Sequence, residues 1–210
     1  MANEKDKLAH ELRQFIVGPI QTNCYAYISH GQCMVVDPGD SGAEIAERLK
    51  DVDVKLIVAT HGHGDHVSGV LALKEKTQAP FAMSEADTEL AMNARAESRF
   101  ADTDAPQPDF YLKDGDTVEV GDAHFDVIAT PGHTPGGLVF LGEGVAFVGD
   151  TLFAGSAGRT DLKGGDQAAL MASLAHLKEV IPPDTMVCSG HGDLTSMAKE
   201  LASNPFLVER

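Results

Sequence analysis

The sequence predicts an α/β fold in which two β-sheets are sandwiched between two layers of helices. Strand-like runs followed by helix-like segments occur twice along the chain, an order that suits two sheets with helices on their outer faces. Several short β-branched apolar runs also end in histidine or aspartate, which is typical of strands that deliver side chains to a shared site. Because the length of 210 residues suits one such unit, we expect a single domain over residues 1–210.

The first quarter of the chain is expected to hold three strands and one helix. Residues 1–12 are rich in charged side chains, and we interpret them as a polar leader. Ser41 and Glu44 have the spacing of a capping box, which predicts a helix over 43–50. His30-Gly31 predicts a hairpin turn between the second and third strands. These strands are expected at 13–17, 24–29 and 33–37.

The middle of the chain alternates strands and helices before an acidic loop. Ser84 is a candidate N-cap for a helix over 85–98. The segment 100–114 contains prolines and several aspartates, and we interpret it as a surface loop that can lie over the site. Strands are expected at 55–60 and 80–83, with a helix over 67–76 between them.

The last part of the chain repeats the strand-rich pattern. Gly121-Asp122 is a hairpin signal, and a glycine-rich loop over 154–165 precedes a helix over 166–179. A final strand and a short helix are expected to close the fold. The other strands of this part are expected at 117–120, 123–129, 137–141 and 145–149.

One loop carries the strongest chemical signal. The segment His61-Gly62-His63-Gly64-Asp65-His66 follows an apolar run and holds three imidazoles and a carboxylate. Imidazole nitrogen and carboxylate oxygen are ligands that zinc prefers. Residues two apart point the same way in extended chain, so we expect His61, His63 and Asp65 to point together. His66 breaks this alternation and is expected to serve a second metal.

Three later apolar runs end in the same kind of residue. His133 follows one run within a turn of prolines and glycines, Asp150 directly follows another, and His191 follows a third. Each of these residues alone would be interpreted as a turn former or a helix cap. Together with the earlier loop, they predict a site for more than one metal ion.

These motifs resemble the metallo-β-lactamase superfamily of αββα hydrolases, and the resemblance runs from about residue 13 to 207. It implies a four-layer αββα sandwich that binds two divalent metals. Zinc is the expected metal, with iron or manganese as alternatives. The implied ligands form two sets and a bridge: His61, His63 and His133 for one metal, Asp65, His66 and His191 for the other, and Asp150 between them.

Further segments resemble the short, single-domain branch of glyoxalase II, the hydroxyacylglutathione hydrolases. The resemblance implies a hydrolase that cleaves an acyl thioester, such as S-lactoylglutathione, through a metal-bound hydroxide that Asp65 would orient. Long-form enzymes add a helical domain that binds glutathione, and we expect none here because little chain follows His191. The segments that carry this resemblance are Asn23-Cys24-Tyr25, 36–39, 149–153, 155–162 and the tail from Gly190 to Leu207.

Other functions stay open at this point. A persulfide dioxygenase of the same superfamily would use one iron held by His61, His133 and Asp150. A non-catalytic, metal-stabilised binding protein would need a closed coordination sphere, which so many ligands beside a glycine-rich loop disfavour. True β-lactamases lack an aspartate at the position of Asp150, and flavodiiron proteins have glutamate where this chain has His63.

The charge of the chain limits its partners. There are 32 acidic and 16 basic residues, and the net charge of −16 disfavours nucleic acid and anionic membranes as partners. No run is long enough to suggest a membrane span or a secretory signal, so a cytoplasmic protein is expected. A glutathione thioester is itself anionic, and Arg159 is the candidate for binding it. A structural salt bridge from Arg159 to Asp161 or Asp166 is the alternative.

The three cysteines and the histidines outside the ligand pattern are interpreted as structural or surface residues. The three cysteines are odd in number and irregularly spaced, which does not indicate a disulfide framework. Cys24 and Cys33 are expected in the core, and Cys188 is interpreted as a buried strand residue although it lies near His191. The histidines outside the ligand pattern are interpreted as surface or structural residues: His10, His30, His124 and His176.

Overall fold

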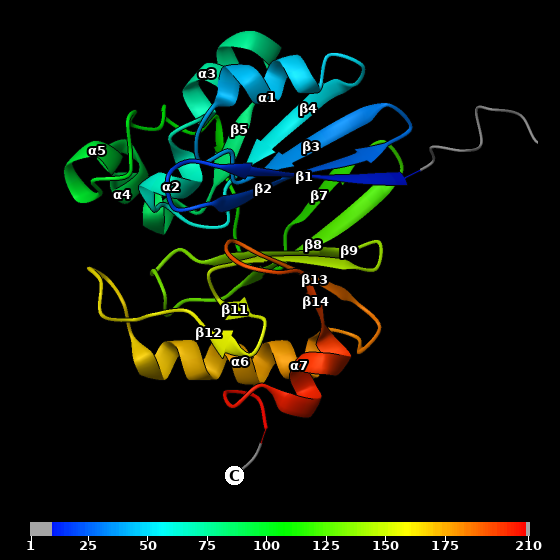
Figure 1. Ribbon diagram of the computed structural model, residues 1–210, viewed down its shortest axis with the longest axis vertical. Coiled ribbons are helices and arrows are strands. Elements are labelled where there is room, and N and C mark those ends of the chain that lie inside the picture. The colour runs from blue at the N-terminus through cyan, green and yellow to red at the C-terminus, as the bar shows by residue number, and fades with distance from the viewer. Residues whose placement is uncertain (1–9, 209–210) are drawn as a thin grey trace, which may run out of the picture.

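The computed structural model describes residues 10–208 and confirms the sandwich of two sheets between helix layers (Figure 1). The first sheet has six strands in chain order, and all eight positions of its second strand are buried because the sheet has packed layers on both faces. The first two pairings are antiparallel and the rest are parallel. Its strands are β1 (His10–Val17), β2 (Thr22–Ser29), β3 (Gln32–Val36), β4 (Asp53–Val58), β5 (Phe81–Met83) and β6 (Phe110–Tyr111).

The second sheet also has six strands, in the order β14-β13-β10-β9-β8-β7. β10 and β13 pair in parallel, and the other pairings are antiparallel. A separate two-stranded hairpin is formed by β11 (Leu152–Phe153) and β12 (Ser156–Ala157). The strands of the second sheet are β7 (Thr117–Val120), β8 (Ala123–Ala129), β9 (Leu138–Gly142), β10 (Val145–Gly149), β13 (Met186–Ser189) and β14 (Thr195–Ser196).

Helices cover the outer faces of both sheets (Figure 1). α1 (Gly42–Arg48) and α3 (Val70–Thr77) lie on the first sheet, while α6 (Gln167–Val180) and α7 (Met197–Ser203) lie on the second. The short helices α2 (Gly64–Val67), α4 (Thr88–Met92) and α5 (Ala94–Glu97) gather at one end of the sandwich.

Three hydrophobic cores lie between the four layers and pack them together. One core joins α1 and α3 to the first sheet through residues such as Ile45 and Leu73. A second fills the space between the sheets, with Tyr25 and Phe147 in contact across it. A third joins α6 and α7 to the second sheet around Leu174. Each core removes apolar side chains from water, which stabilises the layered arrangement.

Two expected helices are interrupted. The helix expected over 67–76 is divided into α2 and α3 at Gly69, because the backbone nitrogen of Gly69 donates to the carbonyl oxygen of Pro38 at 2.8 Å and not to a carbonyl of the helix. The helix expected over 85–98 is divided into a 3₁₀ turn, η2 (Glu85–Asp87), followed by α4 and α5. Ser84 does cap this segment, since its hydroxyl accepts a hydrogen bond from the backbone nitrogen of Ala86.

Two local predictions at the start of the chain are wrong. Ser41 lies in the left-handed region at φ 55°, and its hydroxyl donates to Asp40 instead of capping α1, so the capping box does not form. β1 begins at His10, so residues 10–12 belong to a strand and not to a leader, while residues 1–9 lie outside the described part. Within residues 10–208, no helix is both long and apolar enough to cross a membrane.

Candidate metal centre

The seven predicted ligands converge at one edge of the sandwich. His61 lies just beyond the end of β4, His133 beyond β8, Asp150 directly after β10 and His191 after β13. These strands come from both sheets, and their ends meet at the same edge, so residues far apart in sequence become neighbours. A rigid strand end fixes the direction of each side chain, which suits a metal site.

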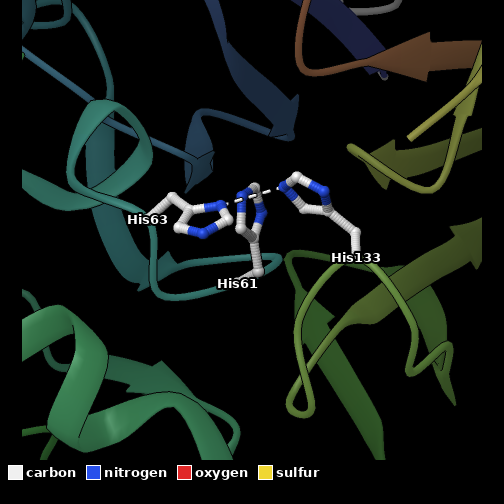
Figure 2. A group of neighbouring side chains, drawn as sticks. All are labelled: His61, His63 and His133. Atoms are coloured by element: carbon white, nitrogen blue, oxygen red, sulfur yellow. Dashed lines mark hydrogen bonds between the residues drawn. The ribbon is translucent and has the colours of Figure 1, made fainter. Parts of the chain in front are cut away.

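His61, His63 and His133 form the first group of ligand atoms (Figure 2). Their nitrogens lie within 4.8 Å of one another, and Nδ1 of His63 is 2.9 Å from Nε2 of His133. The rings of His61 and His133 stand nearly perpendicular, with centroids 4.9 Å apart. Three imidazoles around a common point can hold one divalent ion.

Asp65, His66 and His191 form the second group. Nε2 of His191 lies 3.1 Å from Oδ2 of Asp65, and Nε2 of His66 lies 3.4 Å from the same oxygen. Asp65 therefore belongs with His66, and the expectation that it points together with His61 and His63 is wrong. The reason is local: the extended loop ends at His63, and helix α2 begins at Gly64, so the two-residue alternation stops there.

Asp150 lies between the two groups. Its Oδ1 is 3.4 Å from Nε2 of His66, and its Oδ2 is 3.5 Å from Nε2 of His133 and 3.7 Å from Nε2 of His191. A Cβ atom on Gly190 would collide with both Asp150 and His66, so this close approach requires glycine.

Buried atoms without partners indicate that the centre fits metal ions. Nε2 of His61, Nε2 of His66 and Oδ1 of Asp150 are buried and have no hydrogen-bond partner within residues 10–208. Buried polar atoms are rarely left unpaired, because each one costs about 1–3 kcal/mol. Nε2 of His66 and Oδ1 of Asp150 lie 3.4 Å apart, so a divalent cation bound within the cluster would satisfy them.

The electrostatics of the two groups differ. Burial, reinforced by the neighbouring imidazoles, holds the pKa of His61 well below its usual range and lowers that of His63 to about 3. These rings are thus neutral, the form that binds metal. Burial alone would lower the pKa of His66, but the carboxylates around it raise that pKa to about 10. The same negative potential attracts a cation.

A further shell of contacts orients the ligands. The carboxylate of Asp37, 2.9 Å from Nδ1 of His66, also accepts from the backbone nitrogen and hydroxyl of Thr60. Nδ1 of His133 lies 2.7 Å from the carbonyl oxygen of Arg159, where it can donate. Such contacts select the tautomer that leaves Nε2 free for a metal. Asp37 stands in a segment that the sequence analysis noted, but its role in orienting His66 was not predicted.

Asp87 connects the loop of His61 and His63 to the loop of His133. This role of Asp87 was not predicted from the sequence. Its side chain is fully buried, and its oxygens accept hydrogen bonds from the backbone nitrogens of Gly62 at 2.9 Å and Gly136 at 2.7 Å. In the sequence, Asp87 reads as an ordinary acidic residue in the first turn of a helix. The sequence feature that relates to this contact is a glycine in each loop, because a Cβ atom on Gly62 or Gly136 would collide with Asp87.

The segment Asn23-Cys24-Tyr25 secures the loop that carries His191. The side chain of Asn23 donates to the carbonyl oxygens of Ser189 and Gly192, each at 3.0 Å, and the hydroxyl of Tyr25 donates to Ser189 at 2.8 Å. These contacts cross from the first sheet to the second. They explain why a polar residue occupies the interior of strand β2.

The C-terminal tail secures the β11–β12 hairpin. The side-chain nitrogen of Asn204 donates to the carbonyl oxygens of Phe153 and Ser156, and the carboxylate of Glu200 accepts from the backbone nitrogen of Gly155 at 2.7 Å. Glu200 and Asn204 are both fully buried. The tail therefore fixes a hairpin that forms one wall of the cavity beside the metal centre.

A cavity of about 600 Å³ opens onto the metal centre. Its walls combine metal-centre residues with apolar and basic side chains, and of the segment 100–114 only Phe100 contributes. From the sequence, this segment is interpreted as a surface loop that can lie over the site; its first residue lines the cavity, and Phe110 and Tyr111 near its end join the first sheet as β6. The apolar lining residues are Ile20, Leu90, Phe100, Phe153 and Leu162, and the basic ones are Arg99, Arg159 and Lys163.

Arg159 lines this cavity and also forms a salt bridge. Its guanidinium donates two hydrogen bonds to Asp161, at 2.6 and 2.7 Å. Asp166, the other expected partner, instead caps α6 by accepting from Ala168 and Ala169. Because Arg159 and Asp161 are both exposed, the salt bridge contributes little to stability and does not prevent Arg159 from reaching a ligand.

The residues interpreted as structural lie outside the centre. Cys24, Cys33 and Cys188 are buried free thiols, and burial raises the pKa of Cys188 to about 12. Cys188 packs in the core between the sheets and not against the ligands. The histidines outside the ligand pattern are all exposed to solvent: His10, His30, His124 and His176.

The sequence matches known proteins over most of its length. Residues 17–191 match the sequence profile of the Metallo-beta-lactamase superfamily. An Aquifex aeolicus protein is 42% identical over 92% of this chain and 95% of its own length. A probable metallo-hydrolase, YqgX, from Bacillus subtilis is 34% identical over 93% of this chain and 96% of its own. The hydroxyacylglutathione hydrolase GloC of Haemophilus influenzae is 31% identical over 91% and 95%.

Solved structures with the same fold carry different descriptions. BLEG-1, described as a B3 metallo-beta-lactamase, has a TM-score of 0.88 and 33% identity, with 95% of this chain and 100% of that chain covered. TTHA1623 in a di-iron-bound form has a TM-score of 0.86 and 35% identity, with coverage of 93% and 100%. ETHE1 from Myxococcus xanthus has a TM-score of 0.74 and 29% identity, with coverage of 93% and 83%.

Proposed function

Because this chain belongs to the metallo-beta-lactamase superfamily of metal-dependent hydrolases, we propose that it is a binuclear metal hydrolase that cleaves small acyl thioesters. S-lactoylglutathione is the model substrate, in line with the similarity to the Haemophilus influenzae hydroxyacylglutathione hydrolase. Zinc is the proposed metal, although a neighbour of this fold holds two irons.

One observation carries this proposal. Two groups of ligand atoms share Asp150 between them, and three of their buried atoms lack any partner within the described chain. When bound there, two divalent ions would supply an activated water and a Lewis acid for the thioester carbonyl. A mechanism of this kind needs no serine or cysteine nucleophile, and the three cysteines lie buried in the cores.

The residues of the chain position the reaction. Asp65 is the proposed catalytic residue, since it faces the cavity and its Oδ2 is held at 3.1 Å by the hydroxyl of Thr22. Burial opposes ionisation of Asp65, but His66 and His191 lower its pKa well below the usual range. Asp65 thus stays ionised at neutral pH. It can accept a hydrogen bond from the reacting water, so that the lone pair of the water oxygen points toward the substrate carbonyl.

The cavity suits a substrate with an apolar part and an anionic part. Leu90, Phe100 and Leu162 provide apolar surface within the cavity. Arg159 and Arg99 also line the wall, and the guanidinium of Arg99 lies 4.7 Å from the ring centre of Phe100. The chain carries a net charge of −16, so these arginines, which supply local positive charge, are the proposed binding groups for the carboxylates of a glutathione thioester.

A persulfide dioxygenase is the second candidate. Nε2 of His133 lies 3.5 Å from Oδ2 of Asp150, and the rings of His133 and His61 have centroids 4.9 Å apart, so these three side chains are the candidate ligands for one iron. The similarity to ETHE1 of Myxococcus xanthus supports keeping this candidate.

Elemental analysis of the purified protein separates the two candidates. The hydrolase proposal predicts close to two metal ions per chain, and the His63→Ala variant should hold fewer, because His63 is a ligand only in the binuclear arrangement. One iron per chain, unchanged by His63→Ala, would contradict the binuclear proposal. A β-lactam should be assayed alongside the thioester, since BLEG-1 carries a β-lactamase description.

A further inference from the structure

A second group of metal-ligating side chains lies outside the binuclear centre. His10 begins β1, His30 lies in the turn between β2 and β3, and Asp122 lies in the turn between β7 and β8. One ligand atom from each lies within 4.8 Å of the others. The three side chains come from two sheets, so their meeting is a product of the fold and not of a local sequence motif.

The group lies far from the binuclear centre. β2 runs from Thr22, whose hydroxyl contacts Asp65, to Ser29, which pairs with His10. At about 3.3 Å per residue, the strand separates the two places by roughly 23 Å. In Figure 1, β1 enters the sheet on the side away from α2. The group is therefore independent of the proposed active site.

The ring nitrogens of both histidines face the same carboxylate. Nε2 of His30 is 3.0 Å from Oδ2 of Asp122, and Nε2 of His10 is 3.4 Å from Oδ1. The two rings stand at 73° to each other, with centroids 6.2 Å apart. Two imidazoles and a carboxylate are a ligand set that zinc and similar ions accept, with water at the remaining positions.

Neighbouring side chains hold these ligands in place. The hydroxyl of Tyr27 lies 2.6 Å from Nδ1 of His10, so Nδ1 can donate to it while Nε2 keeps a free lone pair. The hydroxyl of Ser29 donates to Oδ1 of Asp122 at 2.5 Å. Partners of this kind orient metal ligands and raise their affinity.

The turn that carries Asp122 also packs closely against Ser29 at the end of β2. The backbone nitrogen of Asp122 donates to the hydroxyl of Ser29 at 3.2 Å, and a Cβ atom on Gly121 would collide with Ser29. Glu143, in the turn between β9 and β10, lies 3.7 Å from His10 and adds negative charge. The site is thus formed in advance, which lowers the cost of ordering it around an ion.

We propose that His10, His30 and Asp122 bind a divalent transition-metal ion such as Zn²⁺, which joins the turns of the two sheets at the end of the sandwich opposite the binuclear centre. The ion would have a structural or regulatory role, because none of these three ligands lines the cavity at the binuclear centre. This proposal does not depend on the reaction carried out at the other centre.

Equilibrium dialysis of the metal-loaded protein against Zn²⁺ tests the proposal. The wild type should bind one more zinc per chain than His30→Asn, and a large excess of zinc over the dissociation constant should raise its Tm by roughly 5 °C. Asparagine tolerates the left-handed φ of 49° at this turn, so the variant should fold normally. Asp122→Asn should lose the same ion, and Tyr27→Phe should weaken its binding roughly 10- to 100-fold.

His124→Ala is the matched control. His124 is also an exposed histidine beside a carboxylate, with Nδ1 3.3 Å from Glu119, but it belongs to no group of three ligands in the described chain. This variant should bind as much zinc as the wild type. If the wild type took up no zinc beyond the binuclear centre, or if His30→Asn kept the extra ion, the proposed site would be wrong.

Discussion

The buried carboxylate of Asp87 accepts a hydrogen bond of 2.7 Å from the backbone nitrogen of Gly136. Its other oxygen accepts one from Gly62, so a single side chain connects the loop of His61 and His63 to the loop of His133. The positions of the first group of candidate ligands therefore depend on a residue whose side chain hydrogen-bonds to the backbone of their loops. A change at this residue should alter metal binding through the positions of the loops alone.

Asp87→Ala should weaken metal binding roughly 10- to 100-fold, as the loss of a ligand-orienting contact does in other metal sites. It should also lower the free energy of unfolding of the metal-free chain by about 2–5 kcal/mol, because two backbone donors lose their buried acceptor. Metal titration and urea denaturation measure the two effects. Glu85→Ala, an exposed carboxylate on the same turn, is the control and should change neither. Wild-type metal affinity in Asp87→Ala would show that the loops hold their positions without this connection.

The candidate ligands could be predicted from the sequence because local patterns mark them. Each follows an apolar strand, and the dense loop from His61 to His66 has few other interpretations. Contacts between distant segments were missed for the opposite reason. Asp87, and the group formed by His10 and His30 with Asp122, depend on the packing of two sheets, which no local pattern encodes.

The fold was predicted more reliably than its details. The order of strands and helices indicated the sandwich, and the N-cap at Ser84 and the helix after Asp166 are present. The interruption of a helix at Gly69 was missed because its cause is the nearby carbonyl oxygen of Pro38, a tertiary contact. The two-residue strands, such as β6 and β11, are too short to produce an alternating pattern.

Asp150→Asn should abolish turnover and reduce the bound metal. A carboxylate shared by two ions supplies negative charge to both, and an amide supplies none. Elemental analysis and a thioester assay check the two effects. Asp126→Asn, at an exposed position of β8, should keep full activity. Wild-type metal content together with a wild-type rate in Asp150→Asn would rule out the bridging role.

Arg159→Ala should raise KM more for glutathione thioesters than for neutral thioesters. Because the guanidinium is exposed to solvent, we expect a difference of roughly fivefold. Asp161→Asn separates the two roles of this arginine: it removes the salt bridge but leaves the positive charge, so KM should stay the same or fall. An equal rise in KM for both kinds of substrate, or a large loss of Tm in both variants, would indicate a structural role instead.

Glu200 should make the stability of the protein depend on pH. Burial opposes its ionisation, but hydrogen bonds from Thr195, Gly155 and Asn204 lower its pKa below the ordinary value of 4.5. A lowered pKa in the folded state means that the stabilisation is fully present above that ordinary value and is lost as the pH falls through the folded-state pKa.

Glu200→Gln should therefore be less stable than the wild type by about 1–3 kcal/mol at neutral pH, because its amide cannot accept all of these hydrogen bonds. The difference should shrink as the solution is acidified, which thermal unfolding at several pH values can follow. Glu179→Gln, on the exposed face of α6, is the control and should match the wild type. A difference that stays constant with pH would show that the charge of Glu200 is unimportant.

Anaerobic turnover tests the central claim most directly. Hydrolysis requires only water, whereas persulfide oxidation consumes O₂. The metal-loaded protein should cleave S-lactoylglutathione at the same rate with and without oxygen, and it should take up no oxygen when glutathione persulfide is added. Oxygen uptake with the persulfide, together with no thioester cleavage under anaerobic conditions, would contradict the assignment as a hydrolase.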